Sequence, residues 1–287
     1  MDELELLQTI YLASANLKRP FTIGPGDDMG EVVIGNQKIL AAVDQLIVGR
    51  HVTLDTPPAL IGRKAVARCF SDIAAMAGTP VGCLMTACLP SATEQSWANE
   101  VFEGAREAAE EWGGPIFGGD IASIQDGNAS FTLHAIATPP PTGAIKRHGV
   151  KCGDLVCVTG DLGNSNNSHH LSFSPRIEIA IELANTLQSD LHSMIDISDG
   201  LGQDASHLAS LELQLVIQTN LLPLRSGATI QNALCDGEDY ELLFTCNSRP
   251  NHQDVTIIGF VQPREEDSPS VIDENGKDLS QLGWTHT

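Results

Sequence analysis

The stretch GRKAVARCFSDIAAMAGTP, residues 62–80, follows Pro57 and Pro58 and predicts a long helix that ends near Gly78. Proline is well tolerated in the first turn of a helix, and glycine is typical just past its end. The stretch is mostly apolar, so we expect a buried helix, yet it carries Asp72. Because an isolated carboxylate is costly to bury, a compensating cation is expected beside Asp72.

Apolar runs on both sides of this helix alternate between the spacing of helices and that of strands, which predicts an α/β (α+β) fold. Four side chains recur near helical spacing and predict an amphipathic N-terminal helix: Leu4, Leu7, Ile10 and Leu17. Further helices are predicted near residues 93–112 and 199–211, and another is expected to begin with Ser174 as N-cap and Pro175 as first residue. Strands are predicted near residues 38–43, 80–88, 115–117, 129–138, 155–159, 194–197, 213–218, 240–246 and 255–260.

The segment Thr138-Pro139-Pro140-Pro141-Thr142-Gly143 interrupts the alternation. Three consecutive prolines cannot continue a helix or a central strand. A chain of 287 residues with 42% hydrophobic content has room for two domains. We therefore predict one domain over residues 1–141 and a second over residues 142–287.

Charge and cysteine content narrow the class of protein. The 37 acidic residues outnumber the 16 basic ones, which opposes binding to nucleic acid or to an anionic membrane surface. No targeting pattern and no run of about 18 apolar residues is present, so we expect a cytoplasmic protein. The seven cysteines are odd in number and include no C-x-x-C pair, which indicates reduced core thiols and not a zinc site.

Aspartates recur in apolar or glycine-rich contexts where a buried carboxylate needs a counter-ion. Five such segments are present: GPGDDMG, AAVDQLIVG, CFSDIAAMAG, FGGDIAS and MIDISDGL. Magnesium is the natural partner, because it takes a few carboxylates and fills its remaining positions with water and phosphate oxygens. Taken singly, a G-G-D segment is often an ordinary turn, and D-x-S-D-G is often a strand end with a helix cap. Five together favour a site for magnesium and phosphate.

Several common nucleotide-binding motifs are absent. The chain has no G-x-x-x-x-G-K-[ST] loop, no H-R-D with D-F-G, and no G-x-G-x-x-G after a strand. A P-loop or protein-kinase fold is therefore excluded.

The order and content of the aspartate segments instead resemble the superfamily of ATP-dependent enzymes that includes aminoimidazole ribonucleotide synthetase, selenophosphate synthetase and thiamine-monophosphate kinase. The thiamine-monophosphate kinase family is the most similar, and the segments IDISDGL and GEDYEL favour it over the synthetases. The resembling segments follow the family's order over nearly the whole chain: residues 24–28, 43–51, 62–80, 118–120, 146–163, 174–176, 195–201 and 237–242.

The resemblance implies roles for individual residues. Six aspartates are expected to surround several magnesium ions at the ATP phosphates: Asp27, Asp44, Asp72, Asp120, Asp196 and Asp199. Four residues are expected to contact ATP: Gly119, Asp120, Arg147 and Ser198. Three are expected to contact thiamine monophosphate: His51, Glu238 and Trp284. No side chain is expected to act as a covalent or acid–base catalyst.

The resemblance also implies an architecture and a reaction. Residues 1–141 are expected to bind ATP and magnesium and to contribute strands to a β-barrel that spans a homodimer, and residues 142–287 to complete the nucleotide and substrate site. The expected reaction is direct transfer of the γ-phosphoryl group of ATP to thiamine monophosphate, which yields thiamine diphosphate. Bridging magnesium ions offset the repulsion between two polyanions.

Two other functions stay open. One is a related synthetase, although the selenophosphate branch would need a reactive cysteine near the N-terminus and none precedes Cys69. The other is a catalytically impaired paralogue that only binds nucleotide or thiamine phosphates. It is suggested by departures from the family pattern at four positions: Ala42, Val43, Ile121 and Asp236. Asn164 is a further departure, and residues 163–174 form a shorter segment than is usual in the family, without the expected helical excursion.

Overall fold

The computed structural model describes residues 3–14 and 17–284 of the chain. The predicted N-terminal helix is α1, Glu3–Ser14, and it ends before Leu17. The side chains of Leu4 and Leu7, on which that prediction depended, lie outside the described residues. No helix in the described ranges is long and apolar enough to cross a membrane.

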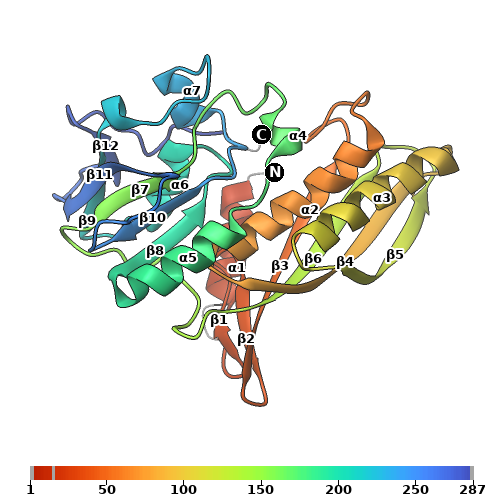
Figure 1. The fold of residues 1–287 in the computed structure, drawn as a ribbon, viewed down its shortest axis with the longest axis horizontal. Helices are drawn as coiled ribbons and strands as arrows, with labels where there is room; N and C mark the ends of the chain where they lie inside the picture. The colour runs from red at the N-terminus through yellow and green to blue at the C-terminus, as the bar shows by residue number, and fades with distance from the viewer. Residues whose placement is uncertain (1–2, 15–16, 285–287) are drawn as a thin grey trace.

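Twelve strands of the described chain form two mixed sheets of six strands each (Figure 1). The first sheet has the order β1-β2-β3-β6-β4-β5 and comprises Phe21–Ile23, Gly30–Ile34, Gln37–Ile47, Thr79–Pro90, Ile116–Ile124 and Ser130–Thr138, numbered β1 to β6 in chain order. The second sheet has the order β12-β9-β11-β7-β10-β8 and comprises Leu155–Thr159, Leu191–Asp196, Leu213–Ile217, Leu242–Cys246, Val255–Pro263 and Val271–Asp273, numbered β7 to β12. The proline-rich segment lies between the two sheets.

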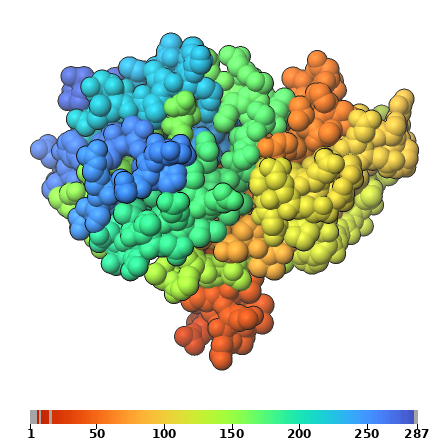
Figure 2. Space-filling view, viewed as in Figure 1, coloured from red at the N-terminus to blue at the C-terminus, as the bar shows by residue number. Residues whose placement is uncertain are grey.

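Six helices follow α1 in the described chain. They are α2 Pro58–Ala75, α3 Gln95–Glu111, α4 His169–Ser172, α5 Ile177–Leu187, α6 Leu201–Leu208 and α7 Ile230–Cys235, with single 3-10 turns at Gln188–Asp190 and Thr219–Leu221. Helices α2 and α3 lie side by side across one face of the first sheet (Figure 1). Figure 2 shows the hairpin of β2 and β3 projecting from the body of the molecule, in red and orange.

Helix α2 connects the two sheets through one hydrophobic core. Its residues Phe70 and Ile73 are fully buried in a cluster that also contains Leu183 of α5, Met194 of β8 and Phe244 of β10. Burial of this kind contributes about 25 cal/mol per Å² of apolar surface. A second core, built from residues of the C-terminal half such as Leu201 and Leu243, lies on the other face of the second sheet. The helix predicted from residues 62–80 thus holds both halves together.

Glycines allow α2 and α3 to approach closely. A Cβ atom at Gly62 would lie 1.9 Å from the carbonyl oxygen of Val101, and one at Gly104 would lie 2.1 Å from that of Ala59. At its other end, α2 stops at Ala75, close to the predicted end at Gly78, and Ala77 adopts a left-handed conformation with φ of 52°. Gly78 follows it and donates its N–H to the carbonyl of Ile73 at 2.8 Å.

Most elements agree with the sequence patterns, and the differences have physical reasons. The predicted strand 115–117 continues to Ile124, because Gly118-Gly119-Asp120 pairs with β4 and does not form a turn. Helix α5 begins at Ile177 and not at Ser174-Pro175, with Arg176 as its N-cap. Short segments carry too few residues to show a period, and this explains why β1, β2, α4, α7 and β12 were not predicted. The short segment 163–174 does contain a helix, the single turn α4.

The contact between α2 and α3 gives a stability prediction. Gly104→Ala should destabilise the protein by about 1–3 kcal/mol, because the methyl group would overlap the backbone of Ala59. Without that overlap, the same change inside a helix would stabilise by about 1 kcal/mol. Urea unfolding measures the difference. The control is Ser96→Ala on the exposed face of α3, which should change stability little; equal effects of the two variants would contradict the prediction.

Candidate active site

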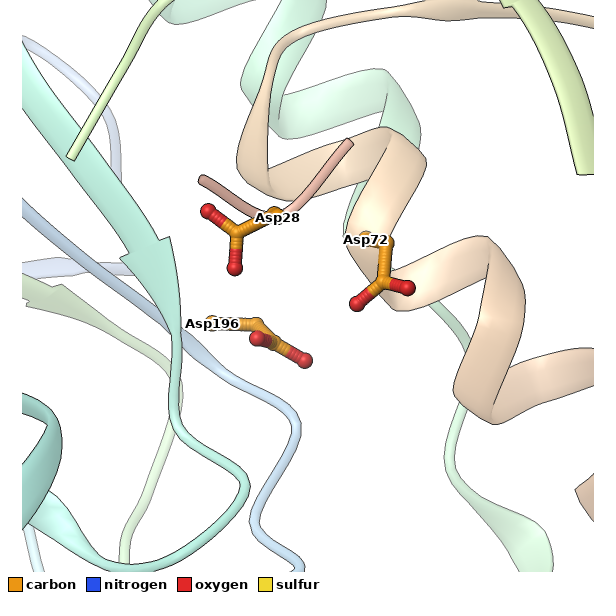
Figure 3. Close-up of side chains that lie close together, drawn as sticks. All are labelled: Asp28, Asp72 and Asp196. Atoms are coloured by element: carbon orange, nitrogen blue, oxygen red, sulfur yellow. The ribbon is translucent and has the colours of Figure 1, made fainter. Parts of the chain in front are cut away.

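Three aspartates from distant parts of the chain converge between the two sheets. Carboxylate oxygens of Asp28, Asp72 and Asp196 all lie within 4.8 Å of one another. Figure 3 shows the three side chains around one space, with Asp28 on a loop, Asp72 on α2 and Asp196 at the end of β8. Because α2 and β8 pack in one core, the fold itself fixes this meeting of acids.

Each acid is held by specific neighbours. Arg147 donates from Nη2 to Oδ1 of Asp28 at 2.7 Å, and its backbone N–H donates to Oδ1 of Asp27 at 3.0 Å. Ser71, next to Asp72 on α2, donates its hydroxyl to Oδ2 of Asp196 at 2.5 Å. Arg147 thus anchors the 24–28 loop, and Ser71 orients the acid at the end of β8.

The electrostatics of the three acids call for a cation. Burial, together with the charge of Asp28, raises the pKa of Asp196 to about 7. Burial and the charge of Asp196 raise the pKa of Asp72 well above its ordinary value. The protein alone therefore keeps protons on this cluster at neutral pH, which is the expected behaviour of like charges crowded in a dry site.

A divalent metal ion fits these residues. The Asp28 side chain is 0% exposed, and its Oδ2 atom has no hydrogen-bond partner among the described residues. Buried acceptors without a partner are rare in folded proteins. The three carboxylates together form a donor set suited to a hard cation such as magnesium.

The other predicted metal ligands lie outside the trio of Asp28, Asp72 and Asp196. Asp27 accepts backbone N–H groups and does not belong to the trio, whose member from that loop is Asp28. Asp44 forms an ion pair with Arg68, with 2.9 Å between Oδ2 and Nε. Asp199 lines a neighbouring cavity and accepts a hydrogen bond from Gln203 at 3.2 Å.

Asp120 lies on the opposite face of the first sheet from Asp44. Asp120 of β5 pairs with Thr86 of β4, Thr86 with Thr132 of β6, and Thr132 with Gln45 of β3, so these four residues form one row across the sheet. Asp44 lies in the next row. Because successive side chains alternate between faces, Asp120 points away from α2, and it is exposed. Next to it, Gly119 is required by close packing, since a Cβ atom there would lie 1.8 Å from the carbonyl oxygen of Met85. Within a single chain, Asp120 therefore lies on the other side of the sheet from the trio.

A cavity of about 250 Å³ lies beside the acids and contains all three predicted substrate residues. His51, Glu238 and Trp284 line it, together with Ser198 and Asp199 of the segment that follows β8. Arg50 stacks over the Trp284 ring with 5.4 Å between the guanidinium carbon and the ring centre. The cavity thus combines an aromatic face, charged groups of both signs and a hydroxyl group.

The charges in the cavity wall are paired. The Glu238 carboxylate lies 2.8 Å from Nζ of Lys64, a side chain that is 0% exposed. Burial opposes ionisation of Glu238, but the His170 imidazole and the Lys64 ammonium outweigh it and lower the pKa of Glu238 to about 2. Burial and the charge of Arg68 lower the pKa of His51 to about 4, so His51 is neutral. Its Nδ1 accepts the N–H of Ile47 at 2.9 Å, which leaves the proton on Nε2.

Four residues of the site were missed by sequence reasoning: Asp28, Lys64, Arg68 and His170. Asp28 was visible as the second of two adjacent aspartates, but a spacing of one residue does not reveal which one turns inward. Lys64 and Arg68 stood in the apolar helix stretch, where a cation needs a partner as much as Asp72 does. His170 gave no signal, since its segment has no period.

Comparison with known proteins identifies the class to which this fold belongs. Residues 26–139 match the family described as AIR synthase related protein, N-terminal domain. The chain superposes on a structure described as AaThiL complexed with AMPPCP and TMP, with a TM-score of 0.82 and 28% identity, covering 100% of this chain and 97% of that one. Hydrogenase maturation protein HypE shares the fold at 16% identity, with a TM-score of 0.70, over 93% of this chain and 96% of that one. The architecture is that of the AIR synthase related class.

Within this class, two curated relatives are thiamine-monophosphate kinases. The protein of Rhodopirellula baltica is 38% identical over 256 residues, which cover 82% of this chain and 79% of the relative. That of Aquifex aeolicus is 30% identical over 91% of this chain and 92% of the relative. The chain belongs to the thiamine-monophosphate kinase family.

The pKa of Asp196 gives a pH prediction. Because its folded pKa of about 7 exceeds the ordinary aspartate value of 3.8, the folded state binds more protons than the unfolded chain between these values, and this group's contribution to stability falls as pH rises through the window. A magnesium ion held by the trio would compete with those protons. The rise in melting temperature on adding Mg²⁺ should therefore be larger at about pH 8 than at about pH 6.

Calorimetric melting in matched ionic strength measures the effect. Asp28→Asn should abolish most of the magnesium-dependent shift, whereas Asp126→Asn, an exposed loop aspartate, should retain it. Magnesium shifts that are independent of pH, or equal in the two variants, would contradict a site at the trio.

Proposed function

We propose that the protein transfers the γ-phosphoryl group of ATP directly to thiamine monophosphate and releases thiamine diphosphate and ADP. The observation that carries this proposal is the buried acidic trio next to a cavity whose wall holds His51, Glu238 and Trp284. Asp196 of the trio and Ser198 of the cavity are two residues apart, hence at most about 7 Å along the chain. Family membership and the AaThiL complex with AMPPCP, an ATP analogue, and TMP support the same reaction.

We further propose that magnesium ions bind at Asp28, Asp72 and Asp196, with the other predicted ligands Asp27, Asp44 and Asp199 close by in the same region. When bound, magnesium neutralises phosphate charge and aligns the donor with the acceptor. The unpaired Oδ2 of Asp28 and the raised pKa values of Asp72 and Asp196 support this assignment.

The protein's own side chains need only bind and orient the reactants. The acceptor phosphate has a second pKa near 6 and is mostly ionised at neutral pH, so no strong general base is required. His51 is neutral and offers an Nε2 proton as a hydrogen-bond donor in the cavity. Ser198 offers a hydroxyl, and the Trp284 ring offers a face for an aromatic or cationic group.

A homodimer would complete the site. Asp120 sits on the outer face of the first sheet, where Val43 is 59% and Phe117 61% exposed, and β5 has a free edge in the described chain. Exposed apolar side chains beside an unpaired strand are typical of a surface that pairs with another copy. We propose that a second chain covers this face and that the first sheets of the two chains together form a barrel. Asp120 and Gly119 would then contact ATP at the junction between the chains.

The reaction is tested by following product. Wild-type protein with ATP, Mg²⁺ and thiamine monophosphate should form thiamine diphosphate in stoichiometric amount with ADP, as separated by chromatography. Binding of both ligands without product would instead indicate the impaired paralogue that Ala42 and Ile121 suggest. Product from a different acceptor only would indicate a related synthetase.

Asp72 provides a test of the metal site. Asp72→Asn should lower the rate of phosphoryl transfer by orders of magnitude, since it removes a carboxylate from the trio. The metal-free variant should melt at a higher temperature than metal-free wild type, because folding disfavours the ionised form of Asp72, and asparagine, which does not titrate, removes that penalty. Asp126→Asn serves as the exposed control. Unchanged turnover in Asp72→Asn would refute the site assignment.

The dimer is tested by complementation. Asp120→Asn and Asp72→Asn should each be inactive alone. If Asp120 serves the site of the other chain, a dissociated and reassociated mixture should regain up to about a quarter of wild-type activity, because half of the random dimers then carry one intact site. A mixture that stays inactive, although mixed dimers form, would place both aspartates in the same chain's site or outside it.

A further inference from the structure

Lys64 is among the largest fully buried side chains of the described residues, and it lies on α2. Its Nζ atom donates to the carbonyl oxygen of His51 at 2.7 Å and contacts the Glu238 carboxylate at 2.8 and 2.9 Å. It also lies 2.8 Å from Nδ1 of His170. An ammonium group has three protons, and the carbonyl oxygen of His51 and the two carboxylate oxygens of Glu238 offer an acceptor for each.

These partners come from three separate segments. His51 belongs to the loop between β3 and α2, His170 to α4, and Glu238 to the turn between α7 and β10. His51 and Glu238 are also walls of the 250 Å³ cavity. One buried ammonium group therefore links the cavity wall of the N-terminal half to that of the C-terminal half.

The turn that carries Glu238 is strained. Glu238 and Tyr240 adopt φ of 53° and 50°, a left-handed conformation that side chains other than glycine disfavour. Such a conformation persists only when its surroundings hold it. The N–H groups of Glu238 and Tyr240 donate to the carbonyls of Ser198 and Ile197 at 2.7 and 2.8 Å. The ion pair with Lys64 fixes the side chain of Glu238.

The same turn is held on its other side by different cations. Arg225 pairs with Asp239 at 2.7 Å, and Arg176 pairs with Glu241. Both arginines line a separate cavity of about 320 Å³ that contains neither His51 nor Glu238. The base of the turn therefore has its own anchors, whereas the face toward the substrate cavity depends on Lys64.

We infer that Lys64 is a positioning residue for thiamine monophosphate, because it fixes His51 and Glu238 at the separation that the cavity requires. The inference rests on the proposed function of that cavity. Lys64 itself does not line the cavity, and the ATP phosphates are assigned to the acidic trio. Loss of Lys64 should thus weaken binding of the acceptor and leave binding of the nucleotide nearly unchanged.

The test is Lys64→Met, which keeps the length of the side chain and removes its charge. The KM for thiamine monophosphate should rise by about tenfold or more, whereas the KM for ATP should change by less than about twofold. A role in general stability would alter both KM values together, or neither. Equal changes in both, or no change in either, would overturn the inference.

Two further variants distinguish a specific positioning role of Lys64 from general destabilisation of the turn. Arg225→Met removes an ion pair of comparable geometry from the far side of the same turn, and it should lower the melting temperature without the selective rise in KM. A rise like that of Lys64→Met would overturn the specific role of Lys64. His170→Gln perturbs the network from its more exposed side and should give a smaller rise for thiamine monophosphate alone. This variant decides the question if Lys64→Met does not fold, and an unchanged KM would overturn the inference.

Calorimetry with thiamine monophosphate and AMPPCP keeps this inference distinct from the proposed reaction. Wild type that binds both ligands but forms no product would refute the reaction, and the binding comparison would still decide the role of Lys64. Selectively weaker binding of thiamine monophosphate by Lys64→Met supports that role, and equal binding overturns it. Wild type that does not bind thiamine monophosphate would overturn both.

Discussion

Buried charge must be compensated, and this requirement shapes the centre of the molecule. Every acid of the turn 238–241 meets a cation from another element: Glu238 with Lys64, Asp239 with Arg225 and Glu241 with Arg176. The trio at Asp28, Asp72 and Asp196 lacks an equivalent set of cations and keeps protons instead. The contrast distinguishes acids that the protein neutralises for structural reasons from acids that it leaves available to an ion.

The sequence predicted the elements that have a clear hydrophobic periodicity, and it singled out the aspartates that stand in apolar surroundings. Helix α2 was predictable because its apolar run is long, and Asp72 stood out as a carboxylate on a mostly apolar helix. Asp196 was recognisable in the same way at the end of a buried strand. His51, Glu238 and Trp284 were assigned from resemblance, and they line one cavity although 233 positions separate the first from the last. Their roles remain predictions.

Other features depend on geometry that no local pattern contains. Whether Asp27 or Asp28 faces the trio is decided by Arg147, which lies about 120 residues away and binds the loop through both its backbone and its side chain. Gly118-Gly119-Asp120 looked like a turn, but close packing against Met85 keeps it in a strand and turns Asp120 outward. Lys64 was hidden because its three partners lie in segments that meet only in the folded chain.

The trio also spans the junction between the two halves, since Asp28 and Asp72 precede the proline-rich segment and Asp196 follows it. An ion coordinated by all three aspartates would connect the two halves, and its affinity would depend on how the halves are aligned. By thermodynamic reciprocity, any influence that shifts the lobes relative to each other also changes metal occupancy. Ion binding at the trio would therefore be coupled to the arrangement of the two halves.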